Sequence, residues 1–200
     1  MKGLPALLIA LALPAVWAQQ FGYPTVYPAA RMGGQYMHNY YIPPAPGSTP
    51  WAPAWSPDAR WIVYTADRNA QSIGLEILNT ASGESSELTS GDQVYLDPVF
   101  SPDGSRLAYV STAPNGNFNI FVRPIRDGRW EGPAVQLTPD HEYPRERDYT
   151  GKWDGHVQPA WTPDGREIVF LCNRDVSFGS GDLWRMPAEA NAFVARCRSV

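Results

Sequence analysis

Three short apolar runs occur along the chain, and each follows the same turn-like phrase. The runs are WIVYTA (61–66), RLAYVS (106–111) and EIVFLC (167–172). Apolar residues occupy successive positions in these runs, whereas a strand with one face in water alternates apolar and polar residues. The pattern therefore predicts three strands that are covered on both faces.

The phrase before each run has the form Pro-x-aromatic-Ser/Thr-Pro-Asp-Gly. In such a phrase Pro sets φ, Asp accepts hydrogen bonds from nearby backbone N–H groups, and Gly adopts a positive φ. Each phrase therefore predicts a tight turn between antiparallel strands, and this role explains the repeated aspartates better than an acidic ring does. These aspartates, spaced 45 and then 61 residues apart, are Asp58, Asp103 and Asp164.

The first copy of the phrase departs from the pattern, because Ala59 stands where the other copies have Gly104 and Gly165. A residue with a side chain at a left-handed position costs about 1 kcal/mol relative to glycine. The first turn is therefore either strained or different in geometry.

Further strands can be recognised after each run. Third strands are expected at 73–78, 118–125 and 181–186, and fourth strands at 85–90 and 134–139, with Gly83 and Gly128 marking the preceding turns. The third unit lacks a clear fourth strand. Four short strands in about 45 residues, with both sheet faces buried, are typical of a propeller blade. The sequence predicts an all-β fold, a partial β-propeller of about three four-stranded antiparallel blades (53–91, 98–139 and 159–200).

The phrase Pro-x-Trp-Ser-Pro-Asp-Gly, together with the blade endings ELT (87–89) and QLT (136–138), resembles the WD40-like repeats of the TolB family of periplasmic β-propellers. The resemblance covers residues 53–200. It implies radial blades in which the Pro-x-Trp strand is innermost.

A second resemblance includes the segment before the repeats. RMGGQYMHNYYIPPAPGSTPWAPAWSPD (31–58) and CNRDVSFGSGDLWRMPAEA (172–190) are similar to the N-terminal part of exported proteins that join such a propeller to an amidohydrolase domain. In that family the metal site lies in the hydrolase half. This chain has no His-x-His motif, so the resemblance assigns no metal ligand, catalytic residue or cofactor to it.

The N-terminal residues predict export. A positive start and a short apolar run are followed by Val16-Trp17-Ala18, which suits a signal peptide over 1–18 and a periplasmic or secreted location. An uncleaved anchor is the alternative. After cleavage no segment is long and apolar enough to span a membrane. Residues 19–52 predict an extended arm that is rich in Tyr and Pro and packs several of its five Tyr rings along the blades.

Bulk composition narrows the possible partners. The 200 residues carry a net charge of −4 with 18% charged residues, which does not favour nucleic acid. Cys172 and Cys197 could form a disulfide in an oxidising compartment or remain separate thiols. Ser180, in FGSGD, is interpreted as a turn residue rather than a nucleophile.

Three histidines, His38, His141 and His156, are interpreted as surface residues rather than metal ligands, since no helix brings them together.

The stretch DHEYPRERDYTGKWDGH (140–156) lengthens the second repeat spacing and combines aromatic and basic residues. Such residues on an exposed loop favour recognition, although a solvated insertion is the alternative. The candidate binding residues are Tyr143, Arg145, Arg147, Tyr149 and Trp153.

Three blades do not close a propeller, which typically needs four to eight. The end blades would therefore expose apolar faces for missing blades, for self-association or for the arm. The sequence predicts a non-catalytic exported TolB-like propeller that binds other proteins. The alternative is the propeller part of a periplasmic metal-dependent amidohydrolase without its catalytic domain, so enzyme status stays open.

Overall fold

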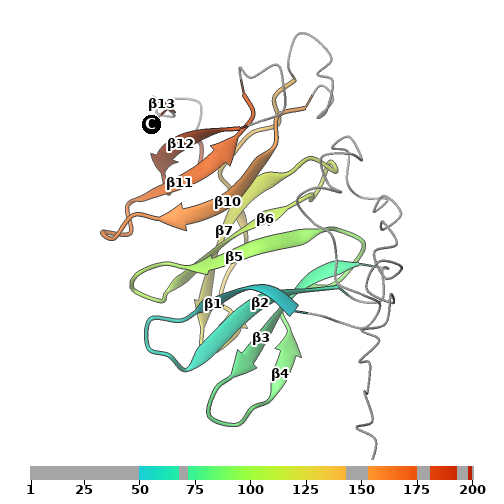
Figure 1. Ribbon diagram of the computed structural model, residues 1–200, viewed down its shortest axis with the longest axis vertical. Coiled ribbons are helices and arrows are strands. Elements are labelled where there is room, and N and C mark those ends of the chain that lie inside the picture. The colour runs from blue at the N-terminus through green and yellow to red at the C-terminus, as the bar shows by residue number, and fades with distance from the viewer. Residues whose placement is uncertain (1–49, 68–71, 143–152, 175–180, 193–197, 200) are drawn as a thin grey trace, which may run out of the picture.

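The chain forms three antiparallel β-sheets that lie side by side, as Figure 1 shows. The computed structural model describes residues 50–67, 72–142, 153–174, 181–192 and 198–199. The signal peptide, the five Tyr residues of the predicted arm, His38, Ser180 and Cys197 lie outside these residues. Within the described ranges, no helix has the length and apolar character needed to cross a lipid bilayer.

Each sheet corresponds to one of the predicted repeats, and we call the sheets blades 1 to 3. Blade 1 contains, in this order, β1 (Pro50–Trp55), β2 (Trp61–Asp67), β3 (Ile73–Asn79) and β4 (Ser85–Glu87). Blade 2 contains β5 (Tyr95–Phe100), β6 (Arg106–Ser111), β7 (Asn119–Arg126), β8 (Arg129–Trp130) and β9 (Val135–Gln136). Blade 3 contains β10 (His156–Trp161), β11 (Glu167–Cys172), β12 (Asp182–Pro187) and β13 (Arg198–Ser199).

The architecture confirms the predicted all-β fold, with three differences in detail. In blade 2 both β8 and β9 pair with β7, so this sheet has five strands. Blade 3 does have a fourth strand, although β13 pairs with β12 through only two residue pairs. Strand β1 begins at Pro50, inside the range predicted for the arm, because Trp51 packs against a buried core cluster.

The repeated turn has the same hydrogen bonds in all three blades. In blade 2 the Ser101 hydroxyl donates to Asp103 Oδ1 (2.6 Å), and the backbone N–H of Ser105 donates to the same carboxylate oxygen (3.1 Å). The Arg106 N–H donates to Ser101 Oγ (2.9 Å). Asp58 and Asp164 have the equivalent contacts. The predicted turn role of the three aspartates is confirmed.

The first strand of each blade contains a β-bulge at one repeat position. The pairing register shifts between Trp51 and Ala54, and it shifts again at the equivalent places in β5 and β10. A bulge inserts one unpaired residue and bends the strand. The inserted position has a positive φ in every blade, at Ala52 (49°), Asp97 (49°) and Gln158 (53°). Because the strain recurs three times, it belongs to the blade geometry rather than to one special site.

Among the described residues, three hydrophobic core clusters and hydrogen bonds between neighbouring sheets join the blades. Trp130 Nε1 of blade 2 donates to the Leu88 carbonyl of blade 1 (2.6 Å). Trp161 Nε1 of blade 3 donates to the Val99 carbonyl of blade 2 (3.2 Å). The Arg106 guanidinium lies 4.5 Å from the centroid of the Trp161 ring, a cation–π contact. The three sheets are therefore packed on one another through repeated, directed contacts.

Burial along the second strands depends on the position of the blade. Five of the six residues of β6 are buried, which confirms the predicted cover on both faces for blade 2. In β11, by contrast, buried and half-buried residues alternate, so the prediction is wrong for blade 3. The physical reason is that, among the three described sheets, only blade 2 has a neighbouring sheet on each side.

Candidate functional site: the base of the insertion between blades 2 and 3

The insertion at 140–156 leaves blade 2 after β9 and enters blade 3 at β10. Of the five candidate binding residues, only Trp153 is described, and it is half-buried. It forms an isolated antiparallel bridge with Glu142. The other four, Tyr143, Arg145, Arg147 and Tyr149, lie outside the described residues, so their role in binding stays a prediction.

A buried carboxylate holds the two ends of the insertion together. The Asp154 side chain is fully buried, and its Oδ2 lies 2.7 Å from His141 Nδ1 and 3.3 Å from Arg174 Nε. The backbone N–H of Asp154 also donates to the His141 carbonyl (2.9 Å). A buried charge requires such partners, because removing it from water is costly. Asp154 therefore ties the insertion to the end of β11.

A second polar group lies at the blade 2 end of the insertion. Asn115, Asn117 and Asn119 all donate side-chain N–H groups to the Asp140 carboxylate, from Asn117 at 2.9 Å and from Asn119 at 2.7 Å. Burial raises the pKa of Asp140, but these three amide hydrogen bonds outweigh burial and the net shift is downward. Asp140 therefore stays ionised and holds the 115–119 turn against the start of the insertion.

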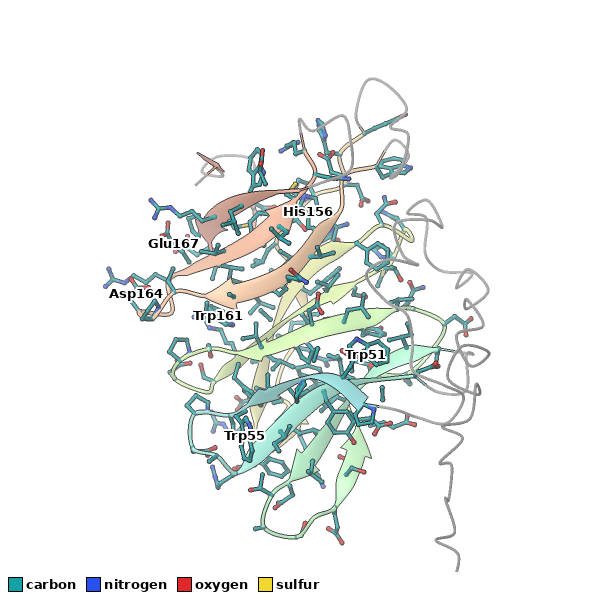
Figure 2. All side chains as sticks on the ribbon, viewed as in Figure 1. Trp51, Trp55, His156, Trp161, Asp164 and Glu167 are labelled. Atoms are coloured by element: carbon teal, nitrogen blue, oxygen red, sulfur yellow. The ribbon has the colours of Figure 1, made fainter. Side chains whose placement is uncertain are left out.

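His156 is deeply buried, and its interpretation as a surface histidine is wrong. It is the first residue of β10, and its ring packs on Phe170 with the centroids 6.0 Å apart. Its Nδ1 lies 3.2 Å from the Phe118 carbonyl oxygen. Desolvation lowers the pKa of His156 to about 4, so the ring is neutral at pH 7. Figure 2 shows His156 and Trp161 at opposite ends of β10.

His141 differs from His156, because its side chain is 37% exposed and contacts Asp154 directly. Within the described part of the chain, no group of three or more His, Cys, Asp or Glu residues is arranged to hold a metal ion. Cys172 is buried, and its Sγ accepts a hydrogen bond from the Arg174 N–H (3.3 Å). Because Cys197 lies outside the described residues, their pairing stays open.

Sequence reasoning missed the residues that anchor the insertion. It weighted the aromatic and basic residues of 140–156, whereas the contacts come from Asp140, Asp154 and two distant segments. One signal was present: three asparagines lie close together at 115, 117 and 119, beside the turn-forming Gly116, and their side-chain amides can all donate to one carboxylate. Arg174 offered no comparable signal.

No protein-family model matches the chain. The uncharacterized peptidase YuxL of Bacillus subtilis is 30% identical over 154 residues, which cover 64% of this chain and 23% of that protein. The Tol-Pal system protein TolB of Francisella tularensis subsp. mediasiatica is 26% identical over 152 residues, covering 60% and 34% of the two chains. This chain thus spans about a quarter to a third of these relatives.

A solved structure from Agrobacterium tumefaciens that is described as a TolB protein superimposes with a TM-score of 0.55 and 21% identity. The superposition covers 76% of this chain and 48% of that one, and it shows the fold. The described sheets and these comparisons confirm the resemblance to TolB-like β-propeller repeats, and a peptidase is among the matching relatives. The described residues form three blades of a TolB-like β-propeller.

Proposed function

We propose that this chain is an exported, non-catalytic propeller module that binds another protein through the insertion between blades 2 and 3. The observation that carries the proposal is the buried Asp154 carboxylate, which joins His141 and Arg174 at the base of the insertion. Loops on a rigid scaffold are common recognition sites, and aromatic and Arg residues dominate binding energies. The insertion has aromatic and Arg residues in its sequence, and the contacts of Asp154 hold its two ends in place.

Similarity to the Tol-Pal system protein TolB supports the proposal at the level of the domain. The sequence of residues 1–18 supports export, with a periplasmic or secreted location after cleavage. The partner we propose is therefore an exported protein that meets this module in the same compartment. Residues 140–156 carry five acidic and three basic side chains, so the partner surface that we propose carries charges of both signs.

The experiment first identifies the partner and then removes the insertion. A photo-crosslinking residue is placed at position 149, with a matched control at the exposed turn residue Thr80. Because Glu142 and Trp153 form a bridge, Asn-Gly can replace residues 143–152 as a two-residue hairpin loop. We expect a crosslink from 149 but not from 80, and at least a tenfold loss of affinity on deletion, typical of losing hot-spot residues.

Equal crosslinking from positions 149 and 80 would contradict this proposal. Unchanged affinity after the deletion would do the same, provided that the shortened chain keeps the unfolding midpoint of the parent. Arg145→Ala and Arg147→Ala in the intact insertion give a second measurement that leaves the loop length unchanged. Their effect on association rate should grow at low salt, since charges outside the binding core mainly steer encounter.

A second candidate is that the chain is the propeller part of a larger hydrolase. The identity to the peptidase YuxL favours it, because this chain spans only 23% of that protein. The resemblance to propeller–amidohydrolase proteins points to the same kind of arrangement with a metal-dependent catalytic domain. Sequencing the reading frame downstream of residue 200 separates the candidates: a hydrolase domain in frame, or encoded beside it, supports the second.

A further inference from the structure

Each blade has two faces, one toward the preceding blade and one toward the following blade, which we call its rear and front faces. Strand pairing defines equivalent positions, since Val63 pairs with Ile77 in blade 1, Ala108 with Val122 in blade 2, and Val169 with Arg185 in blade 3. One hydrophobic core cluster lies between blades 1 and 2, where the front face of blade 1 packs on the rear face of blade 2. Another cluster lies between blades 2 and 3 and joins the front face of blade 2 to the rear face of blade 3.

The front face of blade 3 exposes positions that are buried in the other blades. Leu183 has 51% of its surface exposed, whereas the equivalent Leu75 and Ile120 are fully buried. Val169 and Leu171 beside it are only half-buried. Blade 3 therefore presents an apolar front face of the kind that receives the next blade elsewhere in this molecule.

The rear face of blade 1 is open in the corresponding way. Trp55 is 59% exposed, whereas its equivalent Phe100, which packs against blade 1, is 8% exposed. Ile62 and Tyr64, next to Trp55 on this face, are half-buried, whereas their equivalents in blade 2 are buried. Figure 2 shows Trp55 at the edge of the three-blade array, near the β1–β2 turn.

Each of these two open faces carries a charged residue at a position where another blade has an apolar one. Glu76 on the rear face of blade 1 stands where blade 2 has Phe121, as their pairing with Tyr64 and Tyr109 shows. Arg185 on the front face of blade 3 stands where blade 1 has Ile77. Ile77 and Phe121 lie in the same core cluster between blades 1 and 2, so a blade 3–blade 1 contact of the same geometry would place Arg185 and Glu76 in one interface.

Both charged residues have partners within their own blade. The Tyr64 hydroxyl donates to Glu76 Oε2 (2.8 Å), and Arg185 Nη1 lies 3.8 Å from Glu167 Oε2. A guanidinium has five N–H donors and a carboxylate accepts several hydrogen bonds, so these contacts leave room for a second partner. An Arg–carboxylate pair is also directional, which would set the register of the two faces.

We propose that two copies of this chain associate head to tail, with the front face of blade 3 of each copy packed on the rear face of blade 1 of the other. A second copy is the occupant we infer because each chain carries both faces and both members of the charge pair. The three blades described in each copy give six blades in the pair, a number within the range of about four to eight found in closed propellers. The contact is heterologous, and the two-fold arrangement closes it.

Sedimentation velocity and light scattering of the purified full chain test the association. The 200-residue chain has a mass of 22.2 kDa with residues 1–18 present, and we expect a dimer of twice the mass of the purified chain at micromolar concentration. A monomer at every concentration would overturn the proposal and leave the faces to further blades or to a different protein. An open series of larger species would overturn the closed ring.

Charge reversal tests the register of the contact. Glu76→Arg and Arg185→Glu each place like charges at the interface, so each should raise the dimer dissociation constant at least about tenfold. The double variant Glu76→Arg/Arg185→Glu restores an opposite pair and should recover most of the affinity. If the double variant is as weak as the single variants, or if no variant changes the dimer, the proposed register is wrong. Circular dichroism shows whether each variant folds.

A mixing experiment separates this contact from a symmetric one. Trp55→Asp spoils the rear face and Leu183→Asp spoils the front face, so each variant alone should be monomeric. In a mixture of the two variants, the intact front face of the Trp55→Asp chain can pack on the intact rear face of the Leu183→Asp chain. A dimer should therefore form in the mixture and in neither variant alone. Failure of the mixture to dimerise, while the parent chain does, would overturn the head-to-tail arrangement.

Discussion

Ala59 and Gly104 occupy the same position of the repeated turn, with φ values of 58° and 73°. The first turn therefore keeps the geometry of the others, and its alanine is strained. The Ser56 hydroxyl still donates to Asp58 Oδ1 (2.7 Å), as its equivalents do in the other blades. The turn hydrogen bonds thus hold a residue with a side chain in a left-handed conformation that glycine adopts without strain.

Replacing Ala59 by Gly should stabilise the protein by about 1 kcal/mol, because it removes the left-handed strain. Chemical denaturation monitored by tryptophan fluorescence measures the change. Gly104→Ala is the matched control and should lower the stability. The added Cβ would meet Pro57 Cδ at 3.4 Å, an ordinary van der Waals contact, so the loss comes from the left-handed backbone conformation alone. A destabilised Ala59→Gly variant would show that the strain is absent.

Gly128→Ala should be more destabilising than Gly83→Ala, although the two glycines have φ values of 73° and 74°. A Cβ at Gly128 would lie 2.7 Å from Trp61 ring carbons, whereas a Cβ at Gly83 meets nothing within 4 Å. We expect a loss of about 1 kcal/mol at Gly83 and about 2–4 kcal/mol at Gly128, since overpacking adds to the backbone strain. Equal losses in denaturant melts would mean that the Trp61 ring moves aside freely.

Protonation of His156 should weaken the fold in mildly acidic solution. The pKa of His156 is lowered from 6.5 to about 4 by burial, so the unfolded chain binds a proton that the folded chain does not between these values. Stability is therefore unaffected above pH 6.5 and falls as the pH decreases toward 4, by up to about 3 kcal/mol.

Comparing unfolding free energies of the parent and His156→Gln at several pH values measures this contribution. The variant should lack the slope between pH 6.5 and 4, even if it is less stable at pH 7. The carboxylate of Asp103 serves as a control, because it affects the stability in a lower range of pH. Hydrogen bonds, the strongest from Ser101, lower its pKa to about 2, so its contribution is lost only below pH 4. A parent slope equal to that of His156→Gln would contradict a buried neutral ring.

Asp154→Asn should loosen the base of the insertion. The substitution removes the negative charge that faces His141 at 2.7 Å and Arg174 at 3.3 Å inside the protein. Breaking a buried pair leaves an uncompensated charge, and a loss of about 3 kcal/mol is expected. Hydrogen exchange should rise at residues 140–156, with blade 1 unchanged. The exposed pair of Arg126 and Glu131 (3.0 Å) is the control, since Glu131→Gln should cost under 1 kcal/mol.

The local features of each blade follow from residues that are close together in the sequence. The turn depends on contacts such as Ser101 to Asp103, two residues apart, and Arg106 to Ser101, five residues apart. Interactions over such short spans depend on the side chains at hand, so one phrase specified the same turn three times. The apolar runs between the turns likewise predicted strands, and their repetition predicted blades.

Tertiary structure alone decided which residues of these elements are buried. His156 lies against Phe118, 38 residues earlier, and Trp161 reaches Val99, 62 residues earlier. Neither distance is visible in a local pattern, and so His156 was interpreted as a surface residue. The similar apolar runs of β6 and β11 have different burial because, of the sheets that the structure describes, blade 2 alone lies between two others. The pattern of a strand shows which of its side chains are apolar enough to be buried, but whether they are buried depends on the presence of a neighbouring sheet.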